Sequence, residues 1–101
     1  MQSDPHQIHL ERYQEVLEQR RAKLEDKLIA AGQALDWAVI EKTAAARLTS
    51  KQRATLEAGS LIGAEDESER RKEVGDLTRR LAALDALIEA VDELARTRRN
   101  L

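Results

Sequence analysis

His6 and His9 carry the most specific chemistry in this sequence, because imidazole nitrogens bind metals and exchange protons near neutral pH. Their spacing of three residues places both side chains on one face of a helix. A metal site on that face needs further ligands, but the next turn offers Arg12 and Tyr13 where a carboxylate or a third histidine would be required. A solvated helical turn is the favoured interpretation. We predict no metal and no other cofactor.

The sequence contains no cysteine, which excludes disulfides, thiolate metal ligands and thiol catalysis. It also lacks a glycine-rich loop of the kind that holds phosphates. Carboxylates are plentiful, but no pair stands in a context that would separate their pKa values. We therefore predict that the protein is not an enzyme.

Basic side chains gather in short clusters that could contact phosphates if they shared one face. They are interleaved with Asp and Glu, no aromatic side chain stands beside them for stacking, and the net charge is −2. Ordinary charged helix faces are the favoured interpretation, and nucleic-acid association is the alternative. The clusters are Arg20, Arg21 and Lys23; Arg70, Arg71 and Lys72; Arg79 and Arg80; and Arg96, Arg98 and Arg99.

A short acidic run, Glu65-Asp66-Glu67, falls where the chain is expected to turn between two helices. It resembles the acidic tips of coiled-coil hairpins that insert into RNA polymerase channels and act on a bound metal. That resemblance implies a polymerase-binding regulator as an alternative function. Acidic residues at a helix start are equally explained by the helix dipole, which favours negative charge there.

The element that positions the rest runs from Val74 to Arg98, where apolar residues recur at alternating spacings of three and four. This heptad pattern is typical of a helix that lies along another helix. Leu87 and Leu94 widen the stripe to a breadth suited to a bundle core. We predict self-association through Leu77, Leu81, Leu84, Leu87, Ile88, Val91 and Leu94.

The first half carries a poorer stripe of Leu10, Tyr13, Leu17, Leu24, Leu28, Ala31, Leu35, Ala38, Ala45 and Leu48. A strict seam would be apolar at three positions that are instead charged, namely Arg20, Lys27 and Glu41. Gly32 is expected inside the helix, where it could permit close approach of a neighbouring backbone. A second apolar line through Ile29, Trp37, Ile40 and Ala44 predicts a second neighbour.

The helix boundaries follow from capping signals. Asp4 followed by Pro5 starts a first helix of about residues 5–58. The Thr49–Gln52 pair could form a capping box and break this helix near residue 49, although continuity is slightly favoured. Gly59 and Gly63 bound a turn over residues 59–64, and Asp66 opens a second helix of about residues 66–99.

These features predict a single all-α domain: a long antiparallel, coiled-coil-like helical hairpin that dimerises into a four-helix bundle. The alternative is a three-helix bundle if the first helix breaks near Thr49. No apolar run has membrane-spanning length, and no signal-peptide core is present, so a cytoplasmic location is expected. The expected function is protein–protein interaction, of the adaptor, small-regulator or assembly- and secretion-chaperone type. The expected partner surface comprises Trp37, Ile40, Leu61 and Ile62.

Overall fold

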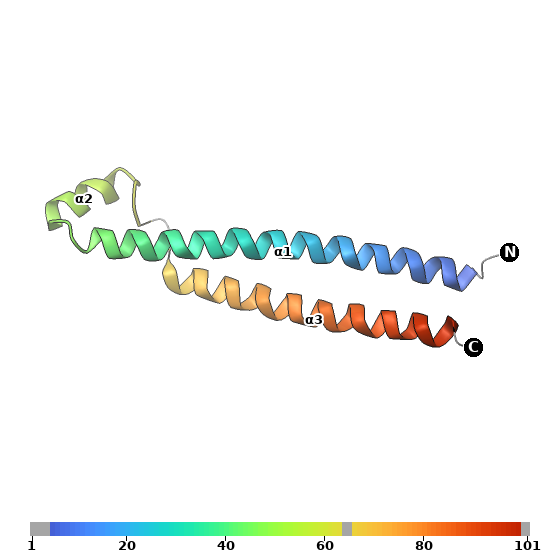
Figure 1. Ribbon diagram of the computed structural model, residues 1–101. Helices are drawn as coiled ribbons and strands as arrows, with labels where there is room; N and C mark the ends of the chain where they lie inside the picture. Colours follow the sequence, from blue (N-terminus) through green and yellow to red (C-terminus); the bar gives the residue numbers. More distant parts are fainter. Residues whose placement is uncertain (1–4, 64–65, 100–101) are drawn as a thin grey trace. The chain divides into compact units, whose positions relative to one another are not determined.

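The computed structural model describes residues 5–63 and 66–99. The chain forms α1 (Pro5–Ala45), α2 (Ser50–Ala58) and α3 (Glu67–Arg99), in this order (Figure 1). No β-strand occurs among the described residues. The all-α prediction is confirmed, as expected for a chain rich in Ala, Leu, Glu and Arg with one proline and four glycines.

Contacts between residues divide the described chain into two units. Unit 1 joins residues 5–27 of α1 to residues 77–99 of α3. Unit 2 comprises residues 28–45 of α1, helix α2, the described linker residues and α3 as far as Asp76. Each long helix therefore contributes one end to unit 1 and the remainder to unit 2.

In unit 1 the two helices run antiparallel, and two polar contacts fix their register. Gln14 Nε2 donates to Asp92 Oδ1 over 2.9 Å. About two helical turns further along α1, Arg21 Nε donates to Asp85 Oδ1 over 2.6 Å. Leu17 lies between these contacts and is only 1% exposed, the largest fully buried side chain among the residues that the structure describes. The core of unit 1 is therefore centred on Leu17.

The predicted heptad stripe of α3 coincides with its least exposed positions. Leu77, Val91 and Ala95 are buried, and the intervening stripe residues Leu81, Leu84 and Ile88 are half-buried. Burial at alternating spacings of three and four is what a helix shows when one neighbour covers one face.

The stripe predicted for α1 is buried or half-buried at every residue except Tyr13. Tyr13 is 39% exposed, and half-buried Gln14 takes its place in the seam. Two turns further on, Arg21 is half-buried and Arg20 is exposed. Apolar residues are sparse in this part of the chain, so the sequence allows two helical phases. Tyr13 and Arg20 fit one phase. Gln14 and Arg21 fit the other, which differs by one residue, about 100° around the helix.

Lys27 was expected at a seam position and is exposed, whereas Leu28 of the predicted stripe is half-buried as expected. At Gly32, a Cβ atom would meet nothing within 4 Å, so this glycine does not mark close approach by a neighbour. The Asp4 cap falls outside the described residues.

The favoured expectation of one helix through residue 58 is wrong, because α1 ends at Ala45 and α2 begins at Ser50. Thr49 has extended backbone angles, its Oγ1 accepts from Gln52 N over 3.1 Å, and its own N–H donates to Gln52 Oε1 over 3.0 Å. This capping box satisfies the first amides of α2 and outweighs the continuing apolar phase. α2 carries no buried side chain, so it does not build a three-helix core.

α2 ends in a Schellman motif, in which Leu61 N donates to Leu56 O and Ser60 N donates to Glu57 O. Gly59 is the C-cap as predicted, but its φ of −84° is ordinary. The left-handed residue is Ser60, with a φ of 57°. A serine thus occupies the position that glycine favours.

Ser60→Gly is expected to raise the free energy of unfolding by about 1 kcal/mol, because glycine adopts the left-handed conformation without the Cβ penalty. Urea denaturation followed by far-UV circular dichroism measures the change. Gly59→Ala is the matched control. A Cβ at Gly59 would meet Thr55 O at 3.6 Å, an ordinary contact, so no loss is expected. A destabilised Ser60→Gly protein would contradict the left-handed assignment.

α3 begins as predicted to within one residue. Asp66 Oδ1 accepts from Ser68 N over 2.9 Å, and Asp66 O accepts the first helical bond from Arg70 N. Asp66 is therefore the N-cap of α3. The helix continues to Arg99 without a break at Gly75.

Candidate interaction surfaces

The most exposed large apolar side chains of α1 lie on one side of unit 2. Ile29, Trp37 and Ile40 are 59%, 70% and 63% exposed, whereas Ala31 and Ala38 are buried. Ile29 precedes Ala31 by two residues and Ile40 follows Ala38 by two, a rotation of about 200° around the helix. We call Ile29, Trp37 and Ile40 the α1 outer face. Its two isoleucines lie opposite the buried stripe of the same helix, and Trp37, one residue before Ala38, lies about 100° from that stripe.

The predicted partner surface is not assembled as one patch. Trp37 and Ile40 lie on the α1 outer face, and Leu61 is 72% exposed beside the end of α2. Ile62 is half-buried and lines a pocket together with Ala38 and Ala45, which belong to the opposite side of α1. The structure therefore separates Ile62 from the outer face. Sequence reasoning placed Ile29 on the correct line but did not assign it to the partner surface.

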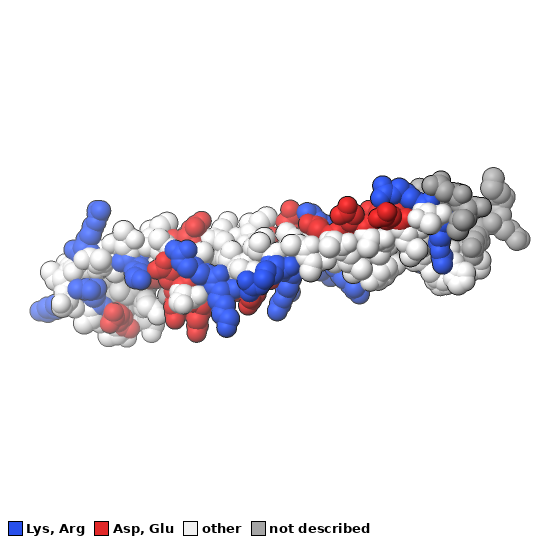
Figure 2. Space-filling model, turned by 90° about the horizontal axis from the view of Figure 1, so that it is seen from below, with Lys and Arg blue, Asp and Glu red and all other residues white. Residues whose placement is uncertain are grey.

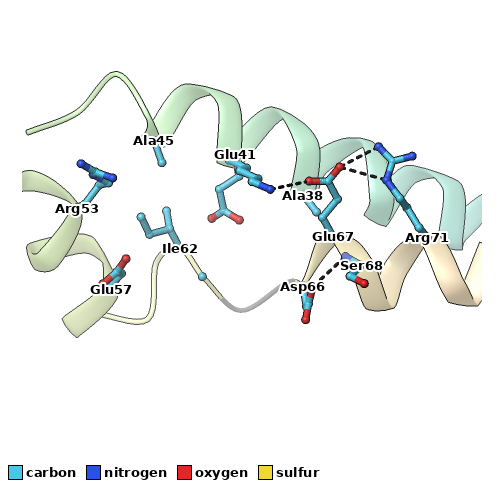
Figure 3. Close-up of a pocket in the computed structure, with 12 residues that line it drawn as sticks. Ala38, Glu41, Ala45, Arg53, Glu57, Ile62, Asp66, Glu67, Ser68 and Arg71 are labelled. Atoms are coloured by element: carbon cyan, nitrogen blue, oxygen red, sulfur yellow. Dashed lines mark hydrogen bonds and ion pairs between the residues drawn. The ribbon is translucent and has the colours of Figure 1, made fainter. Parts of the chain in front are cut away.

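The pocket of unit 2 has a volume of about 590 Å³ and lies between α1, α2 and the start of α3 (Figure 3). Ala38, Ala45 and Ile62 supply its apolar wall. Gly63 and Ser68 also line it, and the remaining side chains carry both charges, namely Glu41, Lys42, Arg53, Glu57, Asp66, Glu67 and Arg71. Such a mixed lining does not single out one ligand charge.

Glu67 is the best-connected side chain at this pocket. Its Oε1 accepts from Arg71 Nη2 over 2.8 Å (Figure 3), and its Oε2 lies 3.3 Å from Lys42 Nζ. The hydrogen bonds from Arg71 and then Lys42 hold the pKa of Glu67 below its ordinary value. The contact with Lys42 ties the start of α3 to α1 within unit 2.

Glu67→Gln is expected to lower stability at neutral pH by a margin that disappears in acid. A carboxyl whose pKa is lower in the folded chain stabilises the fold above its unfolded pKa, and that contribution is lost as the pH falls through the folded pKa. Unfolding free energies of both proteins, measured from about pH 7 to about pH 3, should converge at the acid end. Arg71→Met should shrink the same pH-dependent difference. Equal stability of wild type and Glu67→Gln at every pH would contradict the assigned contacts.

The residues predicted for self-association on α3 fall into two groups. Leu77, Leu81, Leu84, Ile88 and Val91 belong to its buried or half-buried stripe. Leu87 and Leu94 are 42% and 50% exposed and lie beside that stripe, seven residues apart. We call Leu87 and Leu94 the α3 edge.

The other side of the unit 1 seam is acidic. Its residues recur every seven positions and are Glu11, Glu18 and Glu25 on α1 with Asp85 and Asp92 on α3. Figure 2 shows acidic side chains gathered along one edge over this half of the molecule. Like charges on two copies repel, so the acidic side does not suit contact with itself.

Several arginines of the basic clusters are engaged in ion pairs. Arg21 bridges Glu25 and Asp85, and the pKa of Arg21 is raised chiefly by its hydrogen bond to Asp85. Arg71 pairs with Glu67, and Arg70 pairs with Glu73. Carboxylates thus already occupy the guanidinium groups that would have to bind the phosphates of a nucleic acid.

His6 and His9 lie in the first turns of α1, and no group of three potential ligands that could hold a metal occurs in the described part of the chain. Of the helices described, none has both the length and the apolar character needed to cross a bilayer. Comparison with known proteins found no matching family model, curated protein or solved structure.

Proposed function

We propose that the protein is a non-enzymatic helical interaction module, of the adaptor, small-regulator or assembly- and secretion-chaperone type, that associates with itself and binds another protein. The observation that carries this proposal is the α1 outer face. A tryptophan and two isoleucines, each more than half exposed on one helix side, form the kind of apolar surface that marks a protein contact.

The proposed architecture is a long antiparallel hairpin that dimerises into a helical bundle. The antiparallel pairing within unit 1 supports it, as does the continuous stripe of α3. Two apolar surfaces, the α1 outer face and the α3 edge, provide area for a second copy and for a further partner.

The test is the solution mass by light scattering over a dilution series, for the wild type and for the Trp37→Ala/Leu87→Ala double variant. We expect a wild-type dimer or larger species that dissociates at higher concentration when both side chains are truncated. A wild type that stays monomeric at the highest concentration would contradict self-association.

A further inference from the structure

We propose that the α1 outer face binds the same face of a second copy, in an antiparallel contact across a two-fold axis between Ala34 and Leu35. This inference rests on the proposed function and names the surface that holds the second copy. It differs from the sequence-based expectation, which placed self-association on α3.

The outer face is self-complementary in an antiparallel arrangement. A two-fold axis between Ala34 and Leu35 pairs residues whose numbers add to 69, so Ile29 of each copy faces Ile40 of the other. The same axis brings Trp37 of each copy level with Gly32 of the other, two residues from exposed Ala30. A surface that matches itself in this way is what a closed two-fold dimer requires.

Polar residues of the same face select the antiparallel direction. Gln33 and Asp36 are both exposed, and the proposed axis brings the Gln33 amide of one copy to the Asp36 carboxylate of the other. A parallel pairing would instead place Asp36 against Asp36.

The α3 edge is a weaker candidate for this contact. Leu87 and Leu94 are less exposed than any member of the α1 outer face. Antiparallel pairing through Leu87 and Leu94 sets Arg98 of one copy against Ala83 of the other, which gives Arg98 no partner for its charge. The edge is therefore left for the other protein partner.

Sedimentation equilibrium of one variant in the α1 outer face and one in the α3 edge shows which of the two surfaces holds the dimer. Ile40→Asp is expected to raise the dimer dissociation constant at least about 100-fold, because the buried carboxylate occurs twice in a symmetric contact. The matched variant Leu87→Asp/Leu94→Asp is expected to change it by less than about 3-fold. Far-UV circular dichroism checks that both retain the helix content of the wild type.

A charge exchange tests the direction of the contact. Gln33→Glu places a carboxylate opposite Asp36 and should weaken the dimer, and adding Asp36→Lys to the same chain should restore it. In a parallel contact the second change would set lysine against lysine and restore nothing.

The outcomes distinguish this inference from the proposed function. A monomeric wild type would overturn both. A dimer that survives Ile40→Asp and is lost in the α3-edge variant would overturn only the outer-face assignment. Loss with Ile40→Asp but no restoration by Asp36→Lys would overturn the antiparallel contact.

Discussion

Leu17→Ala is expected to lower the free energy of unfolding by about 2–5 kcal/mol, the usual range for truncating a fully buried leucine. Leu17 is 1% exposed and lies between the Gln14–Asp92 and Arg21–Asp85 contacts, where α1 and α3 meet in unit 1. The loss combines apolar contact with the cavity left behind. Chemical denaturation in urea measures it directly.

Val16→Ala is the matched control, because Val16 is adjacent on the same helix but 37% exposed. Its change in unfolding free energy is expected to stay within about 0.5 kcal/mol, since alanine favours the helix and offsets the lost contact. Equal losses at both positions would mean that α1 does not present Leu17 to α3 in solution.

Ala95→Leu is expected to cost about 1–3 kcal/mol by overpacking. Ala95 is 1% exposed, so the added atoms of leucine have no open space and must displace neighbours across the helix contact. The same denaturation experiment applies, and near-UV circular dichroism of Tyr13, in the facing segment of α1, reports local repacking.

Ala90→Leu makes the same change on an exposed position of α3 and should leave unfolding free energy within about 0.5 kcal/mol of the wild type. Because leucine and alanine both favour helices, propensity does not obscure the comparison. A tolerated Ala95→Leu would indicate that the end of α3 separates from α1 without cost.

The prediction of the α3 stripe was accurate because Leu, Ile and Val occupy nearly every seam position there, which leaves one phase. In α1 the same reasoning was wrong by one residue at Tyr13 and Arg20. Polar Gln14 and Arg21 enter that seam because Asp92 and Asp85 on α3 offer them hydrogen-bond partners. Such partners are distant in sequence and become visible only when the helices are paired.

The break before α2 was identifiable as an alternative, since the Thr49–Gln52 capping box is local in sequence. The sequence does not show which alternative is more stable. That choice depends on whether an unbroken helix would bury Leu48 and Leu56 well enough to outweigh the hydrogen bonds of the capping box. The structure leaves α2 without a buried side chain, so that gain is small and the cap prevails.

The sequence by itself determined that this protein is all helical, where α3 lies and which of its residues are buried, because helix propensity, caps and heptad spacing are local properties. Only the tertiary structure decided that Gln14 and Arg21 enter the α1 seam, and that Ile62 is separated from Trp37 and Ile40. Burial depends on which neighbour covers each helix face, and that neighbour comes from a distant part of the chain.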